Sequence, residues 1–138
     1  MKKLLLLSCI VGILFSCNKD DNLNNNSNSE LIGDWKLIEI YVDTGSGGDF
    51  EPVDSEKTIT FHNDGTITSN GDLCGMAIEA DNPTAGTFSS ADSTFNSPDC
   101  DTPIPDHDFR FEQDGNILII DYSPYPCLCS CRAKYIKE

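Results

Sequence analysis

The sequence of 138 residues is short of basic side chains. It holds 9 lysines and arginines against 23 aspartates and glutamates, and two of the nine, Lys2 and Lys3, stand near its start. From residue 17 onward, seven basic residues face all 23 acidic ones, which gives that part a net charge of about −16. Such a surplus repels phosphate backbones and excludes a nucleic-acid-binding protein. We interpret it as a solvated acidic surface that keeps the protein soluble.

Catalytic motifs are missing as well. The sequence has two histidines, His62 and His107, and it contains no Gly-x-Ser-x-Gly elbow, no His-Glu-x-x-His pair and no phosphate-binding loop. Its glycine-rich run at residues 45–48, GSGG, is typical of a flexible connection. Acidic pairs are plentiful, but acid–base catalysis needs a defined geometry that composition does not supply. We therefore expect neither enzymatic activity nor a cofactor.

No hydrophobic run is long enough to cross a membrane as a helix. The longest, Leu4 to Phe15, is too short for about 30 Å of hydrocarbon. It follows Lys2 and Lys3 and is followed by the small residue Ser16, which is the layout of a secretory signal peptide. We therefore predict that residues 1–16 direct the chain to export and are then removed.

A cysteine directly follows this run. The quartet Leu14 to Cys17, LFSC, resembles the bacterial lipobox, in which the cysteine thiol is acylated and the chain is cut just before it. The resemblance implies that Cys17 begins the mature protein and anchors it in the lipid bilayer. Each buried CH₂ group of an acyl chain contributes about 0.8 kcal/mol, so two or three chains would make the anchor almost permanent. The alternative is an ordinary signal peptide followed by a chance cysteine.

The residues after Cys17 carry a second signal. Asn18 to Asp21, NKDD, resembles the lysine-plus-acids export signal of surface lipoproteins of Bacteroidetes. The resemblance implies an outer-membrane lipoprotein exposed on the cell surface, and the alternatives are a periplasm-facing protein or a plain polar tether. Leu23 is the only aliphatic residue between Asn18 and the end of the segment at residue 30, so we expect residues 17–30 to form a disordered tether.

Residues 31–138 have the pattern of one all-β domain. Trp35 to Val42 alternates with period two, and this pattern predicts one face with Ile38, Ile40 and Val42 and another with Leu37, Glu39 and Tyr41. Lys57 to Phe61 also alternates, with Lys57, Ile59 and Phe61 on one face. No segment after residue 16 shows helical periodicity for longer than a turn.

Two similar segments predict β-hairpins. Phe61 to Ile67 and Phe111 to Ile117 each contain an Asp-Gly pair, which accommodates the positive φ angles of a tight turn between twisted strands. Further strands are predicted near residues 87–89, 93–95, 117–122 and 129–137, with a turn at 123–126 and a polar loop at 97–108. We predict about eight short strands in a small up-and-down antiparallel β-barrel, because closure removes exposed strand edges.

The order of the motifs resembles that of lipocalin-like domains, in particular the small lipocalin-like lipoproteins of Bacteroidetes. The matching segments are Leu31 to Leu37 with its Gly-x-Trp opening, Phe61 to Thr66, Gly86 to Phe88, and Cys131 to Lys137. The resemblance covers almost all of residues 31–138 and implies a barrel with Trp35 near its closed end. It supplies no binding residues.

An eight-stranded barrel is either filled by its own side chains or holds one small ligand. Our first hypothesis is a binding module that takes a small apolar molecule or a glycan fragment in or at the mouth of the barrel. The candidate lining residues are Ile38, Ile40, Ile59, Phe61 and Tyr135. The alternative is a filled barrel that acts as a non-enzymatic accessory module and docks another surface protein.

Five cysteines follow the tether, namely Cys74, Cys100, Cys127, Cys129 and Cys131. In an exported chain, cysteines predict disulfides, and an odd number leaves one over. Cysteines two residues apart in a strand rarely bridge without strain, so we expect Cys74 and Cys100 each to pair with one of the other three.

Metal binding is the alternative for these cysteines and for the acidic loop. The cluster CLCSC, with Cys74, Cys100 or His107, has the ligand types for zinc, but zinc sites usually space their cysteines more widely. The aspartates of the polar loop show no EF-hand register, so we interpret them as solvated rather than calcium-binding; they are Asp99, Asp101, Asp106 and Asp108. We expect no metal.

Overall fold

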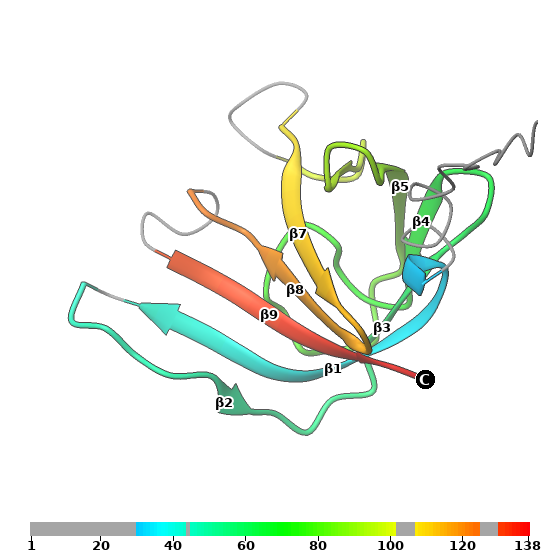
Figure 1. Cartoon of the computed structure of the whole chain (residues 1–138). Helices are drawn as coiled ribbons and strands as arrows, with labels where there is room; N and C mark the ends of the chain where they lie inside the picture. The colour runs from blue at the N-terminus through cyan, green and yellow to red at the C-terminus, as the bar shows by residue number, and fades with distance from the viewer. Residues whose placement is uncertain (1–29, 44, 102–106, 125–129) are drawn as a thin grey trace, which may run out of the picture.

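The computed structural model describes residues 30–43, 45–101, 107–124 and 130–138 (Figure 1). The predictions for residues 1–29, including acylation of Cys17, lie outside the described residues, as do Cys127 and Cys129. Nine strands are present in the described part: β1 Gly33–Asp43, β2 Glu51–Pro52, β3 Thr58–Phe61, β4 Thr66–Ser69, β5 Thr84–Ser89, β6 Thr94–Asn96, β7 Phe109–Asp114, β8 Ile117–Asp121 and β9 Ser130–Lys137. No helix among these residues is long and apolar enough to span a membrane.

The strands form one closed sheet. Their order is β2-β1-β3-β4-β5-β6-β7-β8-β9, and β1 also pairs with β9, which closes the sheet into a barrel. The barrel consists of β1 and β3 to β9, all antiparallel to their neighbours, while β2 pairs with β1 beyond the end of β3. The prediction of an all-β, up-and-down barrel of eight short strands is therefore confirmed, and the architecture is compatible with a lipocalin-like fold.

Both predicted hairpins are present. β3 and β4 are joined by a turn at Gly65, and β7 and β8 by a turn at Gly115. Only the glycine of each Asp-Gly pair has a positive φ, +84° at Gly65 and +58° at Gly115. Asp64 has a different role, because its Oδ1 accepts hydrogen bonds from the backbone N and the Oγ1 of Thr66, which lowers the pKa of its carboxyl.

A β-bulge in β1 corrects the predicted faces of this strand. The pairing with β9 shifts between Leu37 and Glu39, so the strand changes phase at Ile38. Leu37 pairs with Tyr135 and Ile40 with Ala133, and both partners are buried, so Leu37 and Ile40 face the same side. The predicted grouping of Leu37 with Glu39 is therefore wrong, because a bulge inserts one residue and lets the apolar positions before and after it point inward.

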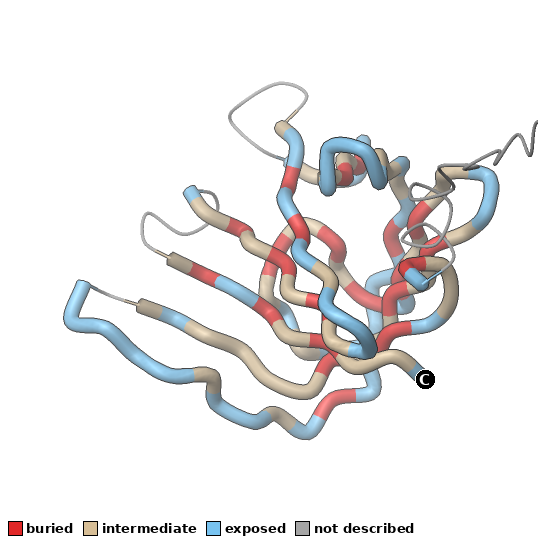
Figure 2. The backbone as a smooth tube through the Cα atoms, viewed as in Figure 1, coloured by how far each residue is buried: buried red, intermediate tan, exposed pale blue. Residues whose placement is uncertain are grey.

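The core fills the inside of the barrel, and buried positions alternate along the strands (Figure 2). Trp35 is fully buried, as the lipocalin-like motif implies, and its Nε1 donates to the Leu31 carbonyl oxygen at 2.8 Å. The other buried apolar residues are Leu31, Leu37, Ile59, Phe61, Ile67, Leu73, Phe95, Phe109, Phe111, Leu118, Ile120, Tyr122, Cys131, Ala133 and Tyr135. Burying one such large side chain contributes about 1.5–3 kcal/mol, so this core is the main source of stability.

One end of the barrel, which we call the closed end, holds the tight turns. β1 starts beside the end of β3, the backbone N of Phe88 donates to the Gly65 carbonyl, and the backbone N of Lys137 donates to the Asn116 carbonyl. The turns after β3, β5 and β7 therefore meet at this end, next to the helical residues 30–31. Residues 70–83 connect β4 to β5 at the opposite end.

A disulfide links two loops at the opposite end and corrects the predicted pairing. Cys74 bonds to Cys100, with 5.2 Å between their Cα atoms, so the prediction that each pairs with a C-terminal cysteine is wrong. Residues 70–83 fold over the end of the barrel and bring Cys74 beside the loop that follows β6, a proximity that spacing in the sequence does not reveal. Cys131 is buried and disulfide-bonded as well.

Candidate functional site

The predicted ligand-binding residues lie in two different parts of the barrel. Ile59, Phe61 and Tyr135 are at most 1% exposed and belong to the core. Ile40 packs against the edge of the core, and Ile38 stands at the bulge, half-buried and outside the core cluster. In this arrangement the five side chains serve packing and strand geometry, and their role in binding a ligand stays a prediction.

The interior near residues 70–83 contains buried polar groups. Lys57 is fully buried on the same face as Ile59 and Phe61, as its alternation predicts, and its Nζ donates to the carbonyl oxygens of Gly75 at 3.2 Å and Ala77 at 2.8 Å. Burial lowers the pKa of Lys57 to about 8, although the carboxylates of Asp72 and Glu79 oppose the shift. These two hydrogen bonds hold residues 70–83 against the inside of the barrel.

Two tyrosines lie in the same interior. Tyr122 and Tyr135 are fully buried, and their hydroxyl oxygens are 3.5 Å apart. Burial raises the pKa of both phenols, so both stay neutral at physiological pH. The contact between the two hydroxyls offsets part of the cost of burying these polar groups.

Residues 70–83 act as a cover for this end. Leu73 is fully buried, and Met76 and Ile78 pack against the core. The cover is also held by hydrogen bonds, from Ser55 Oγ to the Ile78 carbonyl at 2.6 Å and from Thr84 Oγ1 to the Gly71 carbonyl at 2.8 Å. Residues 70–83 therefore cover part of this end of the barrel, and a pocket among the described residues lies on the outside.

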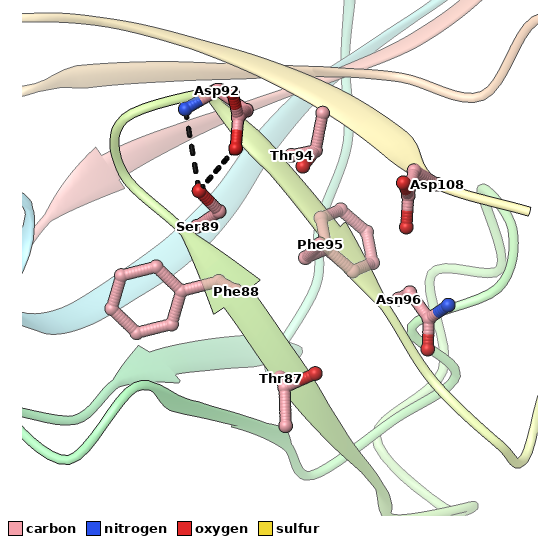
Figure 3. Close-up of a pocket in the computed structure, with 8 residues that line it drawn as sticks. All are labelled: Thr87, Phe88, Ser89, Asp92, Thr94, Phe95, Asn96 and Asp108. Carbon is pink, nitrogen blue, oxygen red and sulfur yellow. Dashed lines mark hydrogen bonds between the residues drawn. The ribbon is translucent and has the colours of Figure 1, made fainter. Parts of the chain in front are cut away.

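A pocket of about 300 Å³ lies on the outside, over the β5–β6 hairpin (Figure 3). Its lining residues are Thr87, Phe88, Ser89, Asp92, Thr94, Phe95, Asn96 and Asp108. The strand register explains how they meet, because Thr87 pairs with Asn96 and Ser89 pairs with Thr94. Paired residues of an antiparallel sheet point to the same face, so four polar side chains share one surface.

The chemistry of this pocket is polar and acidic. Ser89 Oγ donates to Asp92 Oδ2 at 2.7 Å and accepts from the backbone N of Asp92 at 3.3 Å, which fixes the hairpin end (Figure 3). Asp108 stands across the pocket from Asp92. Hydroxyl, amide and carboxylate groups together accept and donate hydrogen bonds, and two carboxylates disfavour an anionic ligand.

A second group of side chains lies on the outer face of β1 and β9. The Tyr41 and Phe50 rings are 5.5 Å apart between centroids, Lys134 Nζ lies 4.1 Å from the Phe50 centroid, and Arg132 lies 6.0 Å from that of Tyr41. Lys134 also forms an ion pair with Glu39. These contacts cover the aromatic rings with charged groups.

Metal ligands do not gather in the described part of the chain. No group of three or more histidine, cysteine or acidic side chains there has the spacing to hold a metal ion. Asp99 accepts a hydrogen bond from the backbone N of Ala85 at 3.1 Å, and His62 Nε2 lies 2.9 Å from Thr68 Oγ1. Asp106 lies outside the described residues.

The β5–β6 pocket was not predicted from the sequence, although short strands were predicted near residues 87–89 and 93–95. A signal was available in the outward positions of both strands, where Thr87, Ser89, Thr94 and Asn96 all carry oxygen or amide groups. Outward polar residues are also typical of any solvent-exposed strand. The pocket forms because Asp92 and Asp108 lie beside these residues.

Comparison with protein-family models, with curated proteins and with solved structures found no match. The resemblance to lipocalin-like domains is therefore one of sequence motifs and of a compatible closed eight-stranded barrel.

Proposed function

We propose that this chain is a lipid-anchored, non-catalytic binding protein of the bacterial outer membrane, displayed on the cell surface, that binds a short glycan fragment on the outside of a lipocalin-like barrel. The LFSC quartet and the NKDD segment support the anchor and the display. The closed barrel and the Gly-x-Trp motif support the lipocalin-like type.

One observation carries the choice of ligand. The interior is packed by fully buried side chains, whereas the β5–β6 pocket of about 300 Å³ is open and lined mostly by hydrogen-bonding groups. Sugar hydroxyls match such a lining, because they donate to carboxylates and accept from amides and hydroxyls. Phe88 and Phe95 pair with each other and pack on the core side of the same hairpin, so the outward lining is polar. A neutral glycan also avoids the repulsion that the acidic chain imposes on anions.

Glycan binding is tested with the full chain on a glycan array, followed by titration calorimetry of the strongest ligand. We expect Asn96→Ala and Asp108→Asn each to weaken binding about 10-fold, which corresponds to about 1.4 kcal/mol. Asn63→Ala, in the exposed turn after β3, is the matched control and should bind normally. Unchanged affinity in both pocket variants would contradict the proposed site.

The anchor and its location need separate measurements. Mass spectrometry of the protein from its host membrane should find an acylated N-terminal Cys17, and the Cys17→Ala variant should leave the membrane fraction. External protease should digest the protein on intact cells. Protection until the outer membrane is opened would place the protein on the periplasmic side instead.

A filled barrel also favours the second function, an accessory module that docks another surface protein. The observation behind it is the packed interior, closed by Leu73 and the cover of residues 70–83. Native mass spectrometry of protein from its own host distinguishes the two functions, because a retained sugar supports the first and a retained protein supports the second.

A further inference from the structure

The outer face of the sheet differs on the two sides of the β5–β6 pocket. On the β7 side, Thr94 pairs with Arg110, and Arg110 pairs with Asp121 of β8, so charged side chains follow the pocket in that direction. On the β4 side, Thr87 pairs with Thr66. Next to the pocket on this side, the surface therefore continues with a hydroxyl group instead of a charge.

Two rows of outward side chains cross the sheet on the β4 side. The row that starts in the pocket consists of Asn96, Thr87 and Thr66, from β6 to β4, and the next row consists of Ala85, Thr68 and Thr60, from β5 to β3. Both rows are half-buried or exposed, whereas the residues that alternate with them in β3 and β4 are buried. We call Thr60, Thr66, Thr68 and Thr87 the threonine surface.

Hydrogen bonds within the chain fix two hydroxyl groups of the threonine surface. Thr66 Oγ1 donates to Asp64 Oδ1 at 2.6 Å, and Thr60 Oγ1 donates to Asp34 Oδ1 at 2.6 Å. A hydroxyl group has one donor and two acceptor lone pairs, so a hydroxyl that donates within the chain can still accept from a ligand. The two carboxylates are acceptors as well. The surface therefore suits a ligand that is rich in donors and carries no negative charge.

The spacing of the strands matches a chain of sugars. Neighbouring strands lie about 4.8 Å apart, which is close to the length of one sugar unit in a linear chain. A chain laid across the strands would place successive units over Asn96, Thr87 and Thr66, and the first two of these residues lie on neighbouring strands in Figure 3. The pocket of about 300 Å³ is at the lower end of the range for ligand sites, about 300–1,000 Å³, so it holds only the end of such a chain.

We propose that the glycan-binding site extends from the β5–β6 pocket across the threonine surface of β5, β4 and β3, and that it takes a linear, neutral oligosaccharide. One end of the oligosaccharide lies in the pocket, and the following units lie across the strands, one unit to a strand. Four strands, β3 to β6, then set the length that is bound at about four units. This inference rests on the proposed glycan-binding function and adds the length and the direction of the ligand to it.

The composition of this surface favours an oligosaccharide over a protein partner. Protein interfaces depend on a few large apolar or aromatic anchors that become fully buried. Among the described residues, the one large apolar side chain that is exposed is Val42, which belongs to β1 and not to the threonine surface. A hydrated chain with many hydroxyl groups can exchange its bonds to water for bonds to the threonine surface without such anchors.

The experiment measures how the affinity of the full chain depends on ligand length. The probes are gluco-, xylo- and manno-oligosaccharides with β-1,4 linkages and two to six units, first immobilised on an array and then free in titration calorimetry. For the series that binds, we expect the tetrasaccharide to bind about 10-fold more tightly than the disaccharide, with little gain beyond it. Thr66→Val has nearly the same shape but lacks the hydroxyl, so it should remove most of this gain and leave the disaccharide unaffected. Thr66→Ser retains the hydroxyl and should keep the gain.

Controls separate the extended site from the pocket and from the fold. Thr58→Val, in the row of β3 that pairs with Lys36, should leave every affinity unchanged, whereas Asn96→Ala should weaken the disaccharide and the tetrasaccharide alike. Thr68→Val repeats the test if Thr66→Val lowers the melting temperature through its lost bond to the turn. Equal affinity for the two lengths, with Asn96→Ala still weakening both, overturns the extended site and leaves the proposed function in place. No binding of any probe overturns the extended site, and no binding of any glycan on the wider array contradicts the proposed function as well.

Discussion

The two sides of the barrel are held together in different ways. On one side, β7, β8, β9 and β1 are five to eleven residues long and pair over most of their length. On the other side, β4, β5 and β6 have three to six residues, and the 14 residues between β4 and β5 are longer than any of these strands. The long-strand side is stabilised by apolar burial, whereas the short-strand side adds a disulfide, a buried lysine and many hydrogen bonds from side chains to backbone.

This difference follows from composition. The segment 70–108 is rich in Asp, Ser, Thr and Pro, and it lacks the apolar alternation that buries a strand. A polar segment gains little from burial, so its order depends on specific bonds that offset the entropy of fixing the chain. The pocket lies on this side, where the outward positions are polar.

The largest loss of stability from a single substitution is expected on the long-strand side. Trp35→Ala removes the largest fully buried side chain and its hydrogen bond to Leu31, so we expect the free energy of unfolding to fall by about 3–5 kcal/mol. Urea denaturation followed by far-UV circular dichroism measures this, and Trp35→Phe is the control that should retain much of the stability. A loss below 1 kcal/mol in Trp35→Ala would show that the closed end is not a packing centre.

Removal of the Cys74–Cys100 disulfide tests the stability of the short-strand side in the same way. Cys74→Ser/Cys100→Ser opens a loop with a sequence separation of 26, and the entropy of that loop predicts a loss of about 3 kcal/mol. The measurement is thermal unfolding of the double variant against the parent chain, both under oxidising conditions. Hydrogen exchange should rise mainly in residues 70–101, and uniform loosening of β7 to β9 would contradict the division into two sides.

The two sides also differ in how far the sequence predicts them. The β7–β8 hairpin, the inward face of β9 and the burial of Trp35 follow from alternation and turn residues, which are local properties. In β1 the apolar positions change from odd, at Trp35 and Leu37, to even, at Ile40 and Val42, and this change marks the bulge that a strict period of two overlooks.

The short-strand side depends on contacts that are distant in the sequence. The Cys74–Cys100 pairing and the bonds of Lys57 to the carbonyls of residues 75 and 77 follow from how residues 70–83 cross the barrel end. The pocket depends on the pairing of β5 with β6 and on the approach of Asp108. Gly86 is similar, because a Cβ atom there would lie 2.1 Å from the Asn96 carbonyl oxygen. The pattern of residues around Gly86 does not reveal this close approach.

The buried lysine makes the short-strand side sensitive to pH. The folded state lowers the pKa of Lys57 from 10.5 to about 8, so between these values the unfolded chain binds more protons. Stability contributed by the neutral lysine is therefore present above pH 10.5 and lost as the pH falls through 8. We expect the free energy of unfolding to rise by about 2 kcal/mol from pH 8 to pH 10.

Lys57→Met is the variant that tests this assignment. It removes the titrating group, so the rise between pH 8 and pH 10 should disappear in urea titrations. Lys36→Met, which removes a half-buried lysine that pairs with exposed Glu56, should keep the rise. Above pH 10 the buried tyrosines act in the opposite direction, because Tyr122 and Tyr135 have raised pKa values and the unfolded chain loses those protons first. An unchanged slope in Lys57→Met would assign the effect to another group.

The smallest loss of stability is expected for substitutions on the outer face of the long-strand side. Phe50→Ala removes the ring contact with Tyr41 and the cation–π contact with Lys134, both of which are partly open to solvent. Such contacts are worth about 0.5–1 kcal/mol at exposed sites, so we expect the melting temperature to fall by only a few degrees. Tyr41→Ala, which removes the same ring contact from the other side, is the companion variant. A loss of stability as large as that of Trp35→Ala would mean that the long strands are stabilised by their outer face as well as by the core. That result would contradict the difference between the two sides.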